Sequence, residues 1–454
     1  MIQSINPATE ELIKEYQEMN SEEINNIISE SHYEFLKWRG TDFQLRSKKM
    51  KKAANILRTK KSEFAEIMTI EMGKPIIQSY SEVEKCSWAC DYFAENSEKF
   101  LADELIETDA SRSFITFQPI GVVLAVMPWN FPFWQVFRFA APSLMAGNAG
   151  VLKHSSNVSG CALAIEGIFR EAGFPVDLFR TLIIPSKNVQ DVIENKFIKA
   201  VTLTGSTAAG ISVAKNAGTQ LKKTVLELGG SDPYLVLEDA DLQAASGTCV
   251  TSRLINGGQS CIAAKRFIIV ESIYNEFEKL FLQKMRAKKM GDPFDEKNDL
   301  GPQARNDLRD ELHHQVVKSV EMGANILLGG EIPKLKGAYY PPTILTDVKR
   351  GMPAYEEELF GPVAALIKVK DEEEAIKVAN DSSFGLGAAV FTKNKSRGEE
   401  IAKKYLNAGS CFVNEFVKSD PRLPFGGINE SGYGRELSFF GIREFVNIKT
   451  VYIK

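Results

Sequence analysis

The alternation of strand-like and helix-like segments is the feature that most constrains how this chain can fold. From about residue 120, short β-branched or apolar runs such as "GVVLAVM", "AVTLTG" and "KTVLEL" alternate with longer segments of helical periodicity. A second series follows from about residue 231 and contains "KRFIIVE", "PVAALIKVK" and "LGAAVFT". Such alternation favours right-handed βαβ units on a parallel sheet. The sequence therefore predicts an α/β protein with two such series.

Two other kinds of segment flank these series. Between about residues 22 and 105 the apolar residues recur at helical spacing, as in "EINNIISESHYEFLKW", so we expect a helical opening segment. The final stretch "EFVNIKTVYIK" is strand-like and has no helix of its own. It is predicted to form an edge strand that can pair with another subunit.

Size and charge restrict the class of protein. A chain of 454 residues that is 44% hydrophobic can bury two or three domain cores. Its net charge of −4 lacks the basic excess of a nucleic-acid-binding protein. The segment "MIQSINPATEEL" does not resemble a secretory signal, and no run of about eighteen apolar residues occurs. We expect a cytoplasmic protein that binds a small molecule and neither nucleic acid nor membrane.

The cysteines and histidines give no sign of a structural metal. The six cysteines form no CxxC pair, and the four histidines lack the spacing of metal ligands. Neither a disulfide scaffold nor a metal site is predicted, and a histidine-activated nucleophile is not indicated.

Cys261 is the strongest candidate for a reactive side chain. A cytosolic cysteine is more often a small buried hydrophobe. Cys261 differs because it follows the turn "NGGQS", which presents a side chain to a cleft while its backbone N–H groups are free to stabilise charge. We predict a thiol nucleophile at this position.

Two further residues would complete a thiol-based site. Glu227 in "VLELGG" ends an apolar strand, at the sheet edge where α/β proteins bind ligands, and is a candidate base. A solvated strand end is the simpler interpretation of that motif. Asn130 lies in the rigid turn "MPWNFPFWQ" and is a candidate oxyanion donor, although an ordinary asparagine turn is equally consistent with the pattern.

The stretch "TLTGSTAAG" predicts a phosphate-binding turn at the start of a helix. It contains Gly205 and Ser206, but Ile211 stands where a triphosphate-binding loop has lysine. The pattern favours a nucleotide that is not used for Mg²⁺-dependent phosphoryl transfer.

Taken together, the motifs resemble those of the aldehyde dehydrogenase superfamily over almost the whole chain. Seven of them occur in the family's order: "INPAT", "PWNFP", "TGSTAAG", "LELGG", "GGQSC", "EELFGPV" and "PFGGINESGYGRE". The resemblance implies a cofactor-binding domain from 1–105 and 120–229 and a catalytic domain from 230–430, both of Rossmann type. It also implies a small β element for oligomerisation, formed by 106–119 and 440–454, in a homodimer or homotetramer.

The resemblance implies roles for individual residues as well. Cys261 matches the nucleophile, Glu227 the base that activates water against a thioester, and Asn130 the oxyanion donor. The cofactor would be NAD or NADP. The residues implied in its binding are Trp129, Lys153, Ser156, Gly205, Ser206, Glu358 and Phe360.

Within the superfamily, "LKHSSNVSG" and "GGQSCIAAKRF" are most similar to the short succinate-semialdehyde dehydrogenases of bacteria and archaea. Arg138 matches an arginine that binds the substrate carboxylate in such enzymes. Its surroundings, "FWQVFRFAAP", are unfavourable for a charge without a partner, which supports that role. Two positions depart from common patterns, because Phe139 replaces a lysine and Ile255 replaces a second arginine.

Ser156 bears on the choice of coenzyme. Many family members have glutamate at this position, bonded to the ribose 2′-hydroxyl, whereas serine does not repel a 2′-phosphate. We therefore expect NADP to be accepted.

Three alternatives remain at this point. The enzyme could oxidise another aliphatic or carboxylated aldehyde, or the chain could be a non-catalytic structural protein of the same fold. A dehydrogenase that transfers the acyl group to CoA is a third, but such enzymes usually lack the water-activating glutamate.

Overall fold

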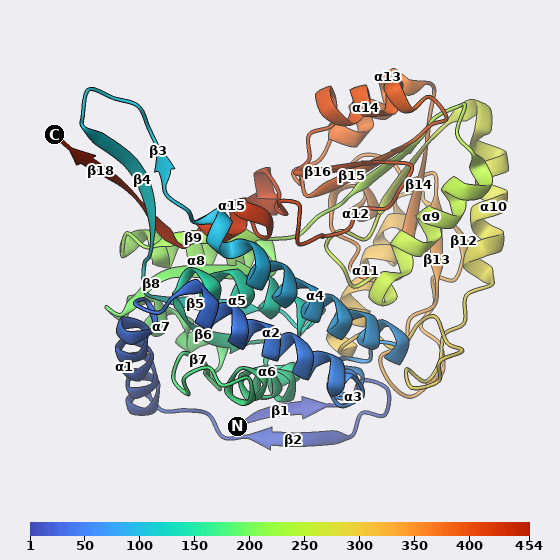
Figure 1. The fold of residues 1–454 in the computed structure, drawn as a ribbon. Helices are drawn as coiled ribbons and strands as arrows, with labels where there is room; N and C mark the ends of the chain where they lie inside the picture. The colour runs from blue at the N-terminus through green and yellow to red at the C-terminus, as the bar shows by residue number, and fades with distance from the viewer.

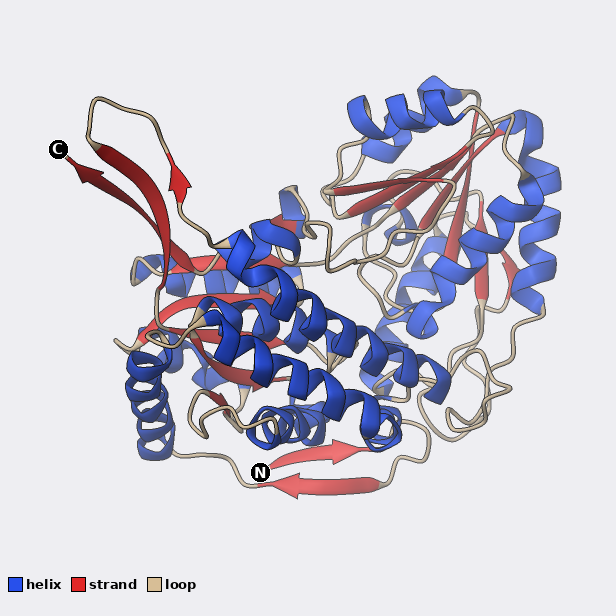
Figure 2. Ribbon diagram, viewed as in Figure 1, coloured by secondary structure: helices blue, strands red, loops and turns tan.

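The computed structural model covers residues 1–454 and shows two α/β bodies and a projecting β arm (Figures 1 and 2). The first body contains a six-stranded sheet of order β17-β9-β8-β5-β6-β7, parallel except for β17. Its strands are β5 (Val122–Met127), β6 (Ala149–His154), β7 (Phe179–Thr181), β8 (Ile198–Thr204), β9 (Lys223–Glu227) and β17 (Gly432–Tyr433).

Helices before and between these strands complete the first body. They are α1 (Ser21–Trp38), α2 (Phe43–Thr59), α3 (Lys61–Met72), α4 (Ile76–Phe100), α5 (Trp134–Ala146), α6 (Ser159–Glu171), α7 (Val189–Glu194), α8 (Thr207–Thr219) and, near the end of the chain, α15 (Ser438–Arg443). A single core of 69 buried residues joins the opening helices to the sheet. The opening helical segment and the first αβ series therefore form one body.

Capping residues explain where several of these helices begin and end. Asn20 and Glu23 form a reciprocal capping box at α1, and the Ser206 side chain accepts from the backbone N–H of Ala209 at α8. Helix α5 ends at Gly147, whose φ of 99° is favourable only for glycine.

The second body contains a seven-stranded sheet of order β12-β13-β14-β11-β10-β15-β16, in which only β12 is antiparallel to its neighbour. Its strands are β10 (Pro233–Val236), β11 (Arg266–Val270), β12 (Asn325–Leu328), β13 (Thr343–Thr346), β14 (Val363–Val369), β15 (Gly387–Phe391) and β16 (Ser410–Val413). Its helices are α9 (Leu242–Leu254), α10 (Tyr274–Arg286), α11 (Asn306–Glu321), α12 (Pro353–Glu356), α13 (Glu372–Asn380) and α14 (Lys395–Lys404).

Alternate side chains of the central strands enter two separate cores in this body. Leu235 and Ile268 lie in one core, whereas their neighbours Tyr234 and Phe267 lie in the other. A sheet that is covered on both faces in this way is expected for parallel strands.

The projecting arm is an antiparallel sheet of order β18-β4-β3, which stands away from both bodies in Figure 1. It consists of β3 (Glu104–Leu105), β4 (Arg112–Pro119) and β18 (Val446–Ile453). The arm is shorter than the β element expected from the sequence, because residues 440–445 lie in or directly after α15. Ile442 and Phe445 are buried in the first core.

A short hairpin of β1 (Ile2–Ile5) and β2 (Leu12–Tyr16) precedes α1. This hairpin was not predicted from the sequence. None of the helices is both long enough and apolar enough to cross a lipid bilayer.

Candidate active site

Cys261 follows a tight turn that connects α9 to β11 in the second body. After α9, Asn256, Gly257 and Gly258 all have positive φ, within a short 3₁₀ segment. Gly258 passes so close to the backbone of Gly361 that a Cβ there would lie 2.2 Å from the Gly361 carbonyl oxygen. The turn thus brings the cysteine next to the "EELFGPV" segment, as only glycine allows.

A buried lysine holds the backbone around Cys261. Lys265 Nζ donates to the carbonyl oxygens of Ser260 (2.9 Å) and Cys261 (2.5 Å), and it forms an ion pair with Glu358 (3.3 Å). The nucleophile is therefore held in place through its main chain.

Cys261 lies where two cavities meet. The first, here called the α8 cleft, has a volume of about 420 Å³ and is lined by Cys261 and by residues that follow β5, β8 and β9. The second, here called the α4 pocket, has a volume of about 600 Å³ and is lined by Ser260 and Ile262, the residues on either side of Cys261, and by part of α4. Cys261 therefore lines the α8 cleft, and its two neighbours in the sequence line the α4 pocket.

Asn130 is brought to the same place as Cys261. It lines the α8 cleft, and its side-chain Nδ2 donates to the carbonyl oxygen of Gln259 (3.1 Å). Asn256 Nδ2 in turn donates to the Asn130 carbonyl (2.7 Å). The amide of Asn130 is therefore oriented by the turn that carries the cysteine, and Nδ2 retains a second hydrogen for another acceptor.

Burial raises the pKa of the Cys261 thiol to about 12, while Arg138 and Lys265 act in the opposite direction. The thiol is consequently protonated at neutral pH in this state. Attack requires that its proton leave as the reaction begins.

Glu227 ends β9 beside the α8 cleft, but its carboxyl group faces inward. Leu228 and Gly229 line the cleft, whereas Glu227 lines neither cavity, and a Cβ on Gly426 would lie 2.7 Å from its Oε1. Burial raises the pKa of Glu227 well above its usual value, and the nearby Glu436 raises it further. Neither oxygen of Glu227 has a hydrogen-bond partner.

Arg138 is buried on α5 and already has a partner. Its guanidinium forms an ion pair with Glu436 and donates to Thr204 Oγ1 (3.1 Å). Arg138 thus has a carboxylate partner within the chain, which its apolar sequence neighbours do not indicate because Glu436 comes from a distant segment. Arg138 lines neither cavity, although it is near enough to lower the pKa of Cys261.

The α8 cleft contains five of the seven residues expected to contact the coenzyme, namely Trp129, Gly205, Ser206, Glu358 and Phe360. The rings of Trp129 and Phe360 meet edge to face, with their centroids 5.7 Å apart. The N-terminus of α8 opens into this cleft, and helix N-termini favour phosphate groups. The residues present therefore fit a dinucleotide.

Lys153 and Ser156 lie farther along the same sheet edge and do not line the cleft itself. Lys153 lies on β6, opposite Val126 of β5, and its Nζ donates to Ser186 Oγ (3.2 Å). Ser156 follows β6 directly. Burial lowers the pKa of Lys153, which has no acidic partner in the structure. A ligand that extends from α8 past β5 would reach them.

The functional neighbours that sequence reasoning missed come from segments far from Cys261. Glu436 lies within the motif "GYGRE" and Lys265 within "GGQSCIAAKRF". The motifs could be recognised in the sequence, but the contacts of these two side chains could not be predicted from it. Lys85 and Ser419, which line the α4 pocket, belong to no motif.

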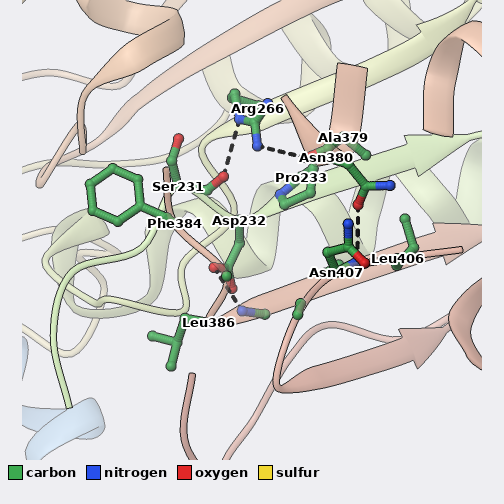
Figure 3. A pocket seen from close by; sticks show the side chains of 14 residues that line it. Ser231, Asp232, Pro233, Arg266, Ala379, Asn380, Phe384, Leu386, Leu406 and Asn407 are labelled. Carbon is green, nitrogen blue, oxygen red and sulfur yellow. Dashed lines mark hydrogen bonds between the residues drawn. The ribbon is translucent and has the colours of Figure 1, made fainter. Parts of the chain in front are cut away.

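A small cavity in the second body is not part of this site (Figure 3). It has a volume of only about 10 Å³, and Arg266 fills its polar wall by donating to the carbonyl oxygens of Ser231, Val378 and Ala379. These contacts satisfy the guanidinium inside the protein and leave no room for a substrate.

Comparisons with known proteins agree with this geometry. A protein of Synechocystis sp. named as a probable NADP(+) succinate-semialdehyde dehydrogenase is 50% identical over 452 residues, which are 100% of this chain and 99% of that protein. An Escherichia coli NAD(P)+ succinate semialdehyde dehydrogenase is 46% identical, over 99% of this chain and 97% of that protein.

A solved structure shows the same fold. The succinic semialdehyde dehydrogenase of Streptococcus pyogenes, crystallised in complex with NADP+, matches with a TM-score of 0.98 and 38% identity over the full length of both chains. The model of the aldehyde dehydrogenase family matches residues 1–451. The order of motifs, the two α/β bodies and the position of Cys261 between two cavities have the same explanation: the chain belongs to the aldehyde dehydrogenase family.

Proposed function

We propose that this protein oxidises succinate semialdehyde to succinate, with NAD or NADP as the electron acceptor. The observation that carries the proposal is the position of Cys261, which lines a cleft that suits a dinucleotide, while its neighbours Ser260 and Ile262 line a separate pocket for the aldehyde. The names of the relatives support this substrate and both coenzymes.

The first half of the reaction uses Cys261 and Asn130. The Cys261 thiol gives its proton to water as its sulfur attacks the aldehyde carbon, and the negative charge that develops on the oxygen is stabilised by Asn130 Nδ2 and the Cys261 backbone N–H. Trp129 and Phe360 would hold a nicotinamide in the α8 cleft, and that ring would supply the acceptor for the hydride that leaves the former aldehyde carbon. A thioester then remains on Cys261.

The second half uses Glu227. Its carboxylate removes a proton from water as the water attacks the thioester, which releases the acid and restores the thiol. Because the side chain faces Gly426 and Glu436 in this structure, we infer that it turns toward Leu228 and Gly229 for this step.

Lys153, Ser156, Ser206 and Glu358 are proposed to hold the coenzyme. Ser156 suits NADP because a hydroxyl donates to a 2′-phosphate and Lys153 adds positive charge. Trp129 and Phe360 would form the wall beside the nicotinamide.

The arm is proposed as the element that joins subunits into a homodimer or homotetramer. Strand β18 is at the edge of its sheet, and Ile448 and Tyr452 on it are more than half exposed. Light scattering of the chain with and without residues 446–454 tests this role, and an unchanged mass would contradict it.

An aldehyde panel tests the main proposal. Succinate semialdehyde, butanal and a longer neutral aldehyde are assayed with each coenzyme by absorbance at the reduced nicotinamide band. We expect the highest kcat/KM with succinate semialdehyde. A higher value with butanal would reject the substrate, and no reduction of either coenzyme with any aldehyde would reject the enzymatic role.

A further inference from the structure

The α4 pocket contains a lysine without an acidic partner. Lys85 projects from α4 into the pocket, where its Nζ donates to Ser419 Oγ (2.8 Å) and lies 4.3 Å from the centre of the Trp134 ring. No carboxylate oxygen lies within 4.0 Å of this nitrogen. Ser419 is itself buried and also accepts from Trp134 Nε1 (3.0 Å), so the position of the ammonium group is well defined.

The other cations of this pocket are paired. Lys288 forms an ion pair with Asp299 (2.7 Å), and Lys418 forms one with Glu415 (3.2 Å). The charges of these two lysines are therefore balanced within the chain. Lys85 alone among the pocket's lysines lacks such a partner.

The environment of Lys85 is unfavourable for an uncompensated charge. Burial lowers its pKa to about 8, and the positive charge of Arg138 acts in the same direction. A carboxylate bound next to Lys85 would favour the charged form of the amine and so act against both effects. The structure thus contains an amine whose charge is favoured by a bound carboxylate.

The walls of the pocket suit a short carbon chain between this amine and the nucleophile. Phe131, Trp134 and Phe416 line it, and Ser260 and Ile262 mark its end beside Cys261. Apolar walls with one or two polar groups fix the orientation of a small ligand.

We propose that Lys85, together with Ser419, binds the distal carboxylate of the semialdehyde and so determines the substrate preference of this enzyme. The inference rests on the proposed function. It adds to Arg138, whose guanidinium is paired with Glu436 in this structure, a lysine that lines the pocket and has no acidic partner.

The decisive experiment compares Lys85→Met with the unaltered protein on two substrates of nearly equal shape. Succinate semialdehyde carries the carboxylate, and methyl 4-oxobutanoate carries a neutral ester in its place. We expect the ratio of kcat/KM for the acid to kcat/KM for the ester to fall by roughly 10- to 100-fold, the range for a lost charge-assisted hydrogen bond. The loss should be in KM for the acid rather than in kcat.

Three variants make this result specific. Lys418→Met removes a cation from the same pocket that is exposed and already paired, and it should leave the ratio unchanged. Lys85→Arg keeps the charge and should restore most of the preference. Ser419→Ala should reduce the ratio by a smaller factor, and it tests the site independently if Lys85→Met fails to fold.

The outcomes separate this inference from the proposed function. If Lys85→Met lost activity equally on acid and ester, or lost none on either, Lys85 would not recognise the carboxylate, although the enzyme could still oxidise succinate semialdehyde. If the unaltered protein preferred the ester, the substrate itself would be wrong.

Discussion

The two cavities that meet at Cys261 are built in different ways. The α8 cleft is lined mainly by short segments that follow three neighbouring strands, namely 128–130 after β5, 204–208 after β8 and 228–229 after β9. The α4 pocket is lined by side chains from α4, α5, α9, the loop 288–299 and the loop 416–419. The first is a product of sheet topology, and the second is assembled from distant parts of the chain.

Their charges differ as well. The side chains that line the α8 cleft include Glu311 and Glu358 but no lysine or arginine, so phosphate binding there relies on backbone N–H groups at α8 and on Lys153 beyond the cleft. The α4 pocket has three lysines, of which two are paired, and it is also lined by Glu82, Glu296 and Asp299. We therefore expect the α8 cleft to bind its ligand mainly through backbone N–H groups. The α4 pocket is expected to bind its ligand through particular side chains.

The largest effect is expected from a substitution of Cys261, which lies between the two cavities. Cys261→Ala removes the group that both cavities serve, and we expect aldehyde oxidation to fall by about 10⁴-fold or more, as when an enzyme loses its nucleophile. Coenzyme binding, followed by quenching of tryptophan fluorescence, should persist because the substitution removes only one small side chain from the α8 cleft. A thermal melt close to that of the unaltered protein is the control, and substantial turnover by the variant would refute the role of Cys261.

Glu227→Gln should separate the two half-reactions. Without a base for water, the enzyme should produce one burst of reduced coenzyme and then slow by roughly 10²- to 10⁴-fold. Stopped-flow absorbance measures both phases, and steady-state turnover near that of the unaltered protein would exclude Glu227 as the base.

The pKa of Glu227 also predicts a pH dependence. Because burial and Glu436 raise this pKa, the carboxylate form is gained only as the pH rises through the raised value. Thioester hydrolysis should therefore accelerate with increasing pH. Glu436→Gln, which removes a neighbouring negative charge, should move the rise to lower pH.

Asn130→Ala tests whether the Asn130 side chain donates a hydrogen bond to the reacting oxygen. Loss of one oxyanion donor should slow formation of the thioester by roughly 10²- to 10³-fold. The burst rate in stopped-flow measurements reports this step, while the later hydrolysis rate serves as a partial control. A loss below tenfold would mean that Asn130 only shapes the turn that it shares with Gln259 and Asn256.

The contrast between the cavities also explains how much of the site was predictable. The two αβ series were visible because each strand and helix has its own periodicity, and "TGSTAAG" and "LELGG" sit directly on the strand ends that form the α8 cleft. A local motif is sufficient to predict a site whose residues follow directly from the ends of neighbouring strands.

The α4 pocket could not be predicted in the same way. Lys85 lies 334 residues from Ser419 in sequence, and no local pattern indicates that they meet. The partner of Arg138 was missed for the same reason, since Glu436 reaches α5 only through the fold of the last segment. The inward orientation of Glu227 likewise depends on Gly426, which is far away in the chain.

Ser156→Glu alters coenzyme binding without touching the α4 pocket. A carboxylate at this position would repel the 2′-phosphate of NADP, and we expect kcat/KM for NADP to fall by roughly 10- to 100-fold while that for NAD changes much less. Initial rates at saturating aldehyde with each coenzyme measure the effect. Equal losses with both coenzymes would show that Ser156 does not face the ribose.

The smallest expected effect is a pH dependence that belongs to the α4 pocket alone. The charge of Lys85 is affected by groups on several elements: Arg138 lowers its pKa, and Glu82, Asp420 and the Cys86 thiol raise it. With a pKa of about 8, Lys85 is an ammonium ion below that pH and a neutral amine above it. The affinity of Lys85 for a carboxylate should therefore be highest near pH 7 and should decrease as the pH rises above 8.

The ratio of kcat/KM for succinate semialdehyde to kcat/KM for its methyl ester separates the titration of Lys85 from that of other groups. Cys261 and Glu227 also change protonation with pH, but they act equally on succinate semialdehyde and on its methyl ester, so their effects cancel in the ratio of kcat/KM values. Because kcat/KM reports the free enzyme, the ratio should fall by about tenfold between pH 7 and pH 9. In Lys85→Met the ratio should be low and independent of pH. A ratio that stays constant through pH 9 in the unaltered protein would mean that no group titrating near pH 8 holds the substrate carboxylate.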